Sequence, residues 1–197
     1  MRRLLPLAIL LILSSCGTLK NPYAPEKLAT TTAPAGAGLI VFSTGAPRTC
    51  VSEPTFLKLL PEGASDRDKE IARVSVDAWS MASDFADHQG NLHAIAIPAG
   101  SYYFTPSVDS TVVRTVLQPK ALFSVTSGET VYLGEYYMLE ACTLSALYEV
   151  HDEMTRDMAL LKSKDSRFDP SKVTKRLMVL SGGLPPCDAT NSELSCR

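Results

Sequence analysis

The 197-residue chain carries 21 acidic and 19 basic residues, which give a formal net charge of −2. No basic patch stands out along it, so the composition argues against nucleic acid as a partner. The apolar run at Leu4–Leu13 is about half of the roughly 20 residues that a transmembrane helix needs. No longer apolar run follows it in the sequence.

The first sixteen residues, MRRLLPLAILLILSSC, have the layout of an export signal, with two arginines before a short apolar run. They end in Leu13-Ser14-Ser15-Cys16, which resembles the lipobox of bacterial lipoproteins. In that family the cysteine becomes the mature N-terminus, and two or more acyl chains give stable anchoring at about 0.8 kcal/mol per buried methylene. We therefore expect residues 1–15 to be a signal peptide and Cys16 to be lipidated. The alternative is an ordinary secretory signal followed by an unmodified cysteine.

The segment after the cysteine predicts where the protein is held. Gly17 stands where an aspartate commonly favours inner-membrane retention in such lipoproteins, so the resemblance implies sorting to the outer membrane, facing the periplasm. Residues 16–37 are rich in Pro, Ala and Thr without a hydrophobic period, which predicts a tether. Removal of residues 1–15 takes away two arginines and no acid, and so changes the formal charge from −2 to −4.

Four further cysteines suit an oxidising compartment: Cys50, Cys142, Cys187 and Cys196. They predict two disulfides, for which three pairings are possible. We favour Cys187–Cys196, because these two enclose a short polar segment in the tail at residues 184–197, together with Cys50–Cys142. No pair has the CxxC spacing that is typical of zinc sites and redox motifs.

Short β-branched or alternating runs fill most of residues 38–150 and predict strands. Polar, glycine-containing segments at residues 88–91 and 127–129 predict turns between them, and residues 61–70 predict a charged loop or a short helix. The expected strands are residues 39–42, 55–60, 72–78, 92–97, 101–105, 112–117, 121–125, 130–138 and 143–150.

The hydrophobic period then changes. Met154, Met158 and Leu161 recur at helical spacing, with Asp152 as the expected N-cap. A second helix is predicted to start at Asp169-Pro170 and to end at Gly182-Gly183, because its apolar residues repeat the same spacing. Those residues are Val173, Leu177 and Leu180. The element order predicts a mainly β domain over residues 38–183, an antiparallel β-sandwich of about 7–9 strands with two C-terminal helices packed on one face.

The strand at residues 130–138 is apolar on both sides, so both of its faces are expected to be covered. We expect the two helices to supply that cover. The alternative is an exposed tyrosine face that binds a small molecule or a glycan. Its candidate stacking residues are Tyr102, Tyr103, Tyr132 and Tyr136.

The segments IPAGSYYF (97–104) and FSVTSGETVYLGEYYM (123–138) carry a second resemblance. Their Pro-x-Gly-x-Tyr turn and later Tyr-Leu-Gly strand resemble prealbumin-like, carboxypeptidase-regulatory-like sandwiches. They are also similar to uncharacterised bacterial lipoproteins that pair such a sandwich with C-terminal helices. The resemblance covers roughly residues 38–180. It implies an interaction module and no activity.

Residues for catalysis or for a metal are sparse. The sequence contains no GxSxG or phosphate-binding motif, and no catalytic, cofactor or metal residues are expected. An alternative metal site would use Asp84, Asp87, His88 and His93. His93, however, shares a strand face with two isoleucines, Ile95 and Ile97, that should point inward.

Glu135 is the acid of most interest, because alternation places it on the same side as Val131, Leu133 and Tyr137. Either it reaches water at a strand end, or it is a buried acid that is held by an arginine such as Arg73 or Arg114.

Together these features predict a non-enzymatic interaction or structural module of the cell envelope, which is bound to the membrane through Cys16 and docks an envelope protein. The alternatives are a binding module that uses the tyrosines and a hydrolase whose site assembles around His151.

Overall fold

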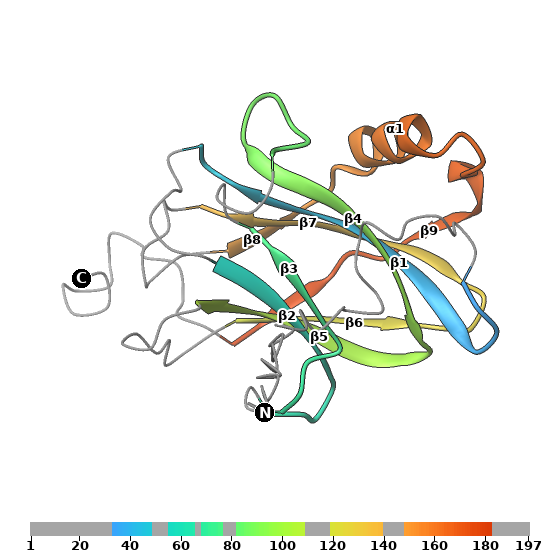
Figure 1. Ribbon diagram of the computed structural model, residues 1–197. Coiled ribbons are helices and arrows are strands. Elements are labelled where there is room, and N and C mark those ends of the chain that lie inside the picture. Colours follow the sequence, from blue (N-terminus) through green and yellow to red (C-terminus); the bar gives the residue numbers. More distant parts are fainter. Residues whose placement is uncertain are drawn as a thin grey trace, which may run out of the picture.

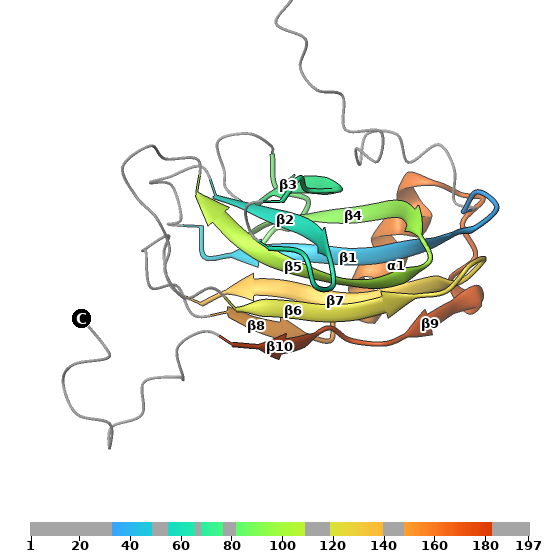
Figure 2. The ribbon, with the colours of Figure 1, turned by 90° about the horizontal axis from the view of Figure 1, so that it is seen from below.

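The computed structural model describes residues 33–48, 55–65, 68–76, 82–108, 119–139 and 148–182. In these ranges the chain forms two five-stranded sheets that lie in two layers, with one α-helix on the outer side of the first sheet (Figures 1 and 2). The predicted mainly β fold is confirmed. No helix in the described ranges is long and apolar enough to cross a membrane.

The first sheet has the order β4-β1-β7-β8, with β9 paired to the end of β7. It is mixed, because β1 and β9 both run parallel to β7, whereas β4 and β8 pair in the antiparallel sense. The expectation of a purely antiparallel fold is wrong for these two pairings. The strands are β1 at Ala37–Ala46, β4 at Gln89–Pro98, β7 at Thr130–Met138, β8 at Tyr148–His151 and β9 at Val173–Lys175.

The second sheet has the order β10-β6-β5-β2-β3 and is antiparallel throughout. β2, β3, β5 and β6 agree with predicted strands, whereas β10 lies in the segment that was predicted as the second helix. The predicted strand at residues 112–117 and most of the one at residues 143–150 lie outside the described residues. The strands of this sheet are β2 at Thr55–Pro61, β3 at Ala72–Ser75, β5 at Gly100–Val108, β6 at Lys120–Val125 and β10 at Val179–Ser181.

Helix α1 spans Met154–Lys164 where the apolar stripe predicts it. Glu153, rather than Asp152, is the residue before the first turn, and it makes no side-chain cap. Asp152 still accepts a hydrogen bond from the Met154 amide at 3.4 Å.

The predicted second helix is wrong. Asp169 does cap a turn by accepting from the Ser171 amide at 3.1 Å, but only a 3₁₀ turn at Pro170–Lys172 follows before β9 and β10. The amides of Arg176 and Met178 donate to β7 carbonyls at 2.9 Å instead of to their own segment. Pairing with a distant strand therefore outweighs the local helical spacing.

Two apolar clusters hold the layers together. The larger one lies between the sheets, and the smaller one lies between the first sheet and α1. The outer face of the first sheet is thus covered by α1, one of the two helices that were predicted to cover it. The larger cluster includes Ile40, Phe42, Leu57, Leu59, Ile95, Phe104, Val131, Leu133 and Tyr136. The smaller cluster includes Leu39, Val41, Leu92, Tyr132, Met158 and Leu161.

A bulge in β7 decides which side chains face which cluster. Between the pairs Val41↔Tyr132 and Ser43↔Glu135, β1 advances by two residues and β7 by three. Gly134 lies in this step with φ of 93°, a backbone conformation that favours glycine. The extra residue reverses the alternation, so Glu135 leaves the inter-sheet side on which the sequence pattern placed it.

Candidate functional site

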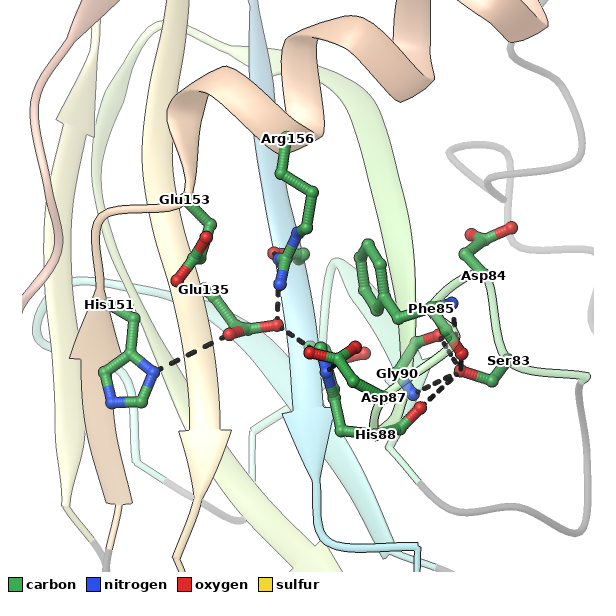
Figure 3. Close-up of polar contacts among 12 residues, drawn as sticks. Ser83, Asp84, Phe85, Asp87, His88, Gly90, Glu135, His151, Glu153 and Arg156 are labelled. Atoms are coloured by element: carbon green, nitrogen blue, oxygen red, sulfur yellow. Dashed lines mark hydrogen bonds and ion pairs between the residues drawn. The ribbon is translucent and has the colours of Figure 1, made fainter.

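Glu135 is the centre of a polar cluster beneath the first turn of α1 (Figure 3). Its side chain is 2% exposed. Arg156 Nη2 donates to Glu135 Oε1 at 2.9 Å, and His88 Nε2 lies 3.0 Å from the same oxygen. Gly45 on β1 leaves the room that this arrangement needs, because a Cβ there would overlap the Tyr137 ring and lie 2.9 Å from Glu135 Oε1.

A second carboxylate neutralises the arginine. Asp157 is fully buried and accepts hydrogen bonds from Ser43 Oγ at 2.6 Å, Tyr132 OH at 2.9 Å and Arg156 Nε at 2.9 Å. Burial alone would lower the pKa of Arg156, but its bonds to Asp157 and then Glu135 outweigh burial and raise that pKa. Burial, reinforced by the Asp157 charge, raises the pKa of the Tyr132 hydroxyl. The network joins β1, β7 and α1.

Planar groups line one side of Glu135. The Arg156 guanidinium lies 3.9 Å from the centre of the Phe85 ring, and Phe85 stacks on His88 at 4.7 Å. The ring centres of Tyr137 and His88 lie 5.7 Å apart in an edge-to-face arrangement, and the same tyrosine stacks on His151 with ring centres 5.1 Å apart. Asp87 Oδ1 holds the other nitrogen of His88 at 2.8 Å. The segment before β4 thus closes over the cluster and fixes the ring of His88.

The opposite side of Glu135 faces His151 and Glu153. Figure 3 shows these two side chains on the side of Glu135 that lies away from His88. His151 Nδ1 lies 3.7 Å from Glu135 Oε2, and His151 Nε2 lies 2.8 Å from Glu149 Oε2. One ligand-type atom from each of Glu135, His151 and Glu153 falls within 4.8 Å of the others. Among the described residues, this set has the composition and spacing to hold a metal ion.

The metal set that the sequence offered as an alternative is not assembled. His88 turns toward Glu135. His93 instead points into the protein interior and stacks on Phe42 with ring centres 5.0 Å apart, as the strand face that it shares with Ile95 and Ile97 predicted. Asp84 pairs with Lys164 and accepts from the Leu92 amide at 2.9 Å. Burial opposes these contacts, but they prevail and lower the pKa of Asp84.

The four tyrosines proposed as a binding face are all buried. Tyr102 donates to the Pro98 carbonyl and Tyr103 to the Ala64 carbonyl, each at 2.8 Å. Tyr132 lies under α1 and Tyr136 lies between the sheets. They form no common exposed face, which favours their interpretation as packing residues.

Sequence reasoning identified Glu135 but not its partners. Arg73 pairs with Glu70 at 2.7 Å instead, and Arg114 lies outside the described residues. The sequence did contain one signal for these partners, because the acidic residue Asp157 stands beside Met158 of the apolar stripe of α1. The structure buries Asp157 fully. The lipidation and disulfide positions also lie outside the described residues: Cys16, Cys50, Cys142, Cys187 and Cys196.

The cluster offers no hydroxyl nucleophile that a substrate could reach, but its side toward His151 and Glu153 offers ligand atoms for a cation. Ser43, the hydroxyl beside Asp157, is fully buried and bonded to both Asp157 and Arg156, so substrate has no access to it. Glu135 Oε1 is occupied by Arg156 Nη2 and His88 Nε2, whereas the side toward His151 and Glu153 carries further ligand-type atoms. No protein-family model matches this sequence, and no curated protein matches it.

Proposed function

We propose that this chain is a lipid-anchored outer-membrane protein that faces the periplasm and serves a non-enzymatic, interaction or structural role in the cell envelope. Its body would be of the β-sandwich class. The observation that carries the proposal is the segment Leu13-Ser14-Ser15-Cys16, placed between a short apolar run and a Pro-, Ala- and Thr-rich tether.

The geometry of the polar cluster supports a non-enzymatic role. Catalysis by a hydroxyl nucleophile needs that hydroxyl next to a base and within reach of substrate. Ser43 is 0% exposed, and its hydroxyl is bound to Asp157 at 2.6 Å. His151, the histidine around which a hydrolase site was considered, contacts Glu149 and Glu135 rather than a serine. The contact between Ser43 and Asp157 joins β1 to α1, as expected of a cluster that holds the helix on the first sheet.

The anchor is tested by mass spectrometry of the mature N-terminus, combined with separation of inner and outer membranes. We expect a chain that begins at Cys16, carries diacylglycerol and acyl mass, and is found in the outer-membrane fraction. The matched variant Cys16→Ser should keep its first fifteen residues and lose the lipid. A wild-type protein recovered from aqueous extract with residues 1–15 attached would overturn the proposal.

The interaction role is tested separately, by crosslinking in intact cells. Cys16→Ser serves as the control, because its body is unchanged while its location is not. We expect the wild-type chain to form a discrete heteromeric adduct that the control lacks. Recovery of monomer alone from wild-type cells would contradict the docking role and leave the anchor untouched.

A further inference from the structure

The geometry points to a divalent transition-metal site of the zinc class, formed by His151 Nδ1, Glu135 Oε2 and the Glu153 carboxylate. These ligands come from the end of β8, from β7 just after the bulge, and from the residue before α1. A bound ion would therefore link the start of α1 to the first sheet, next to the Arg156 and Asp157 network.

The spacing of the donor atoms suits an ion better than a direct contact. His151 Nδ1 and Glu135 Oε2 are 3.7 Å apart, which is longer than a hydrogen bond. Two ligands at zinc–nitrogen and zinc–oxygen distances, at tetrahedral angles, are separated by about 3.4 Å. Glu153 completes a set whose atoms all lie within 4.8 Å of one another.

Side chains that would not touch the ion orient two of its ligands, His151 and Glu135. Glu149 Oε2 lies 2.8 Å from His151 Nε2. A neutral imidazole that donates its Nε2 proton to this carboxylate keeps its Nδ1 lone pair directed at the site. A carboxylate behind a ligating histidine is the usual arrangement in metal sites. Glu135 is held in the same way, because His88 and Arg156 bind Oε1 and leave Oε2 facing His151.

Charge also favours a cation at this point. The carboxylates of Glu135 and Glu153 converge, and the described contacts of Glu153 include no donor to its side chain. Arg156, the positive charge that binds Glu135, is also paired with Asp157 at 2.9 Å. Imidazole with carboxylate suits zinc and its neighbours, whereas calcium and magnesium prefer all-oxygen sites. The half-buried positions of His151 and Glu153 leave water a route to a fourth ligand position.

The test uses the full-length, untagged chain, purified in detergent and stripped with a chelator. It is titrated with Zn²⁺ and, separately, with Ca²⁺ by calorimetry, and with Co²⁺ by visible absorption. We expect one strong Zn²⁺ site per chain, no comparable Ca²⁺ binding, and Co²⁺ absorption bands of a nitrogen- and oxygen-ligated ion.

The variants locate the ion. Glu153→Gln and His151→Gln should each weaken Zn²⁺ binding by more than tenfold, and His151→Gln should remove the Co²⁺ bands. Glu149→Gln should weaken binding by about 10- to 100-fold through loss of the orienting carboxylate. The matched control Glu62→Gln, at an exposed turn of the second sheet, should leave binding unchanged.

Three results would overturn the site. They are no Zn²⁺ binding by the wild-type chain, preference for Ca²⁺, or wild-type affinity in both Glu153→Gln and His151→Gln, which would place the ion elsewhere, for example on thiols. Thermal melts accompany each titration. If His151→Gln does not fold, Glu153→Gln decides the outcome, since the Glu153 side chain makes no cap of its own.

Discussion

Tyr132 and Tyr136 lie four residues apart on β7, yet their hydroxyl groups have opposite surroundings. Both side chains are fully buried. The Tyr132 hydroxyl donates to Asp157 at 2.9 Å and accepts from the Glu153 amide at 3.1 Å under α1. The Tyr136 hydroxyl lies between the sheets without a hydrogen-bond partner in the described structure, its ring 4.9 Å from that of Tyr148. The bulge at Gly134 separates the two environments.

Removal of each hydroxyl should therefore have a different effect. Tyr132→Phe is expected to lower the free energy of unfolding by about 1–3 kcal/mol, because buried Asp157 and the Glu153 amide each lose a partner. Tyr136→Phe should change it by less than about 0.5 kcal/mol or raise it, since a buried hydroxyl without a partner is unfavourable. Urea unfolding of both variants measures the difference. Equal losses would mean that the Tyr136 hydroxyl is bonded after all.

Asp157→Asn should be among the most destabilising single substitutions in the described part of the chain. It removes one of the two counter-charges of Arg156 and turns one acceptor oxygen of the fully buried Asp157 into a donor that faces other donors. Breaking one partner of such a buried pair typically costs about 3–5 kcal/mol. The control is Glu70→Gln, which removes the same charge from the Glu70–Arg73 pair at the surface. That change should cost less than about 1 kcal/mol. Similar urea midpoints for the two variants would show that the network under α1 does not support the fold.

The bulge can be tested with a matched pair of glycines. Gly134 and Gly63 have φ values of 93° and 86°, so alanine at either position should cost about 1–2 kcal/mol in backbone strain. Gly63 has open space around it. A Cβ on Gly134 would lie 2.9 Å from Val150 Cγ1 and 3.0 Å from the His151 carbonyl. We expect the melting temperature of Gly134→Ala to fall well below that of Gly63→Ala. Equal melting temperatures would mean that β8 can move aside.

Much of the fold could be read from the sequence, because most strands and α1 show the period of their own local structure. The segment after Asp169 could not. Val173, Leu177 and Leu180 have helical spacing, but the amides of Arg176 and Met178 find carbonyl partners on β7, about 45 residues earlier in the chain. Such pairing depends on which strand lies next to the segment, and local spacing carries no information about that.

The site was predictable only in outline. Burial of Glu135 followed from the apolar residues around it, but a simple alternation assigned it to the wrong face. Gly134 was the only local sign of a bulge, and glycine alone does not indicate where a strand shifts register. Arg156 stands 21 residues from Glu135, and no spacing rule connects them.

His93 should make stability fall in mild acid. It is fully buried, with Nε2 3.2 Å from Thr44 Oγ1 and Nδ1 without a partner in the described structure. Burial lowers the pKa of His93 to about 4, the Lys164 charge adds to the decrease, and the Asp84 charge opposes it.

In the unfolded chain this histidine would titrate near its ordinary pKa of 6.5. As the pH falls from 6.5 toward 4, the unfolded state therefore takes up a proton that the folded state does not, and unfolding becomes easier by about 3 kcal/mol. Below both pKa values no further loss arises from this residue. His93→Leu should remove this component, so the difference in unfolding free energy between wild type and variant should change by about 3 kcal/mol between about pH 7.5 and about pH 4. Urea unfolding across that range measures it, and a constant difference would show that His93 is protonated as readily in the folded protein as in the unfolded chain.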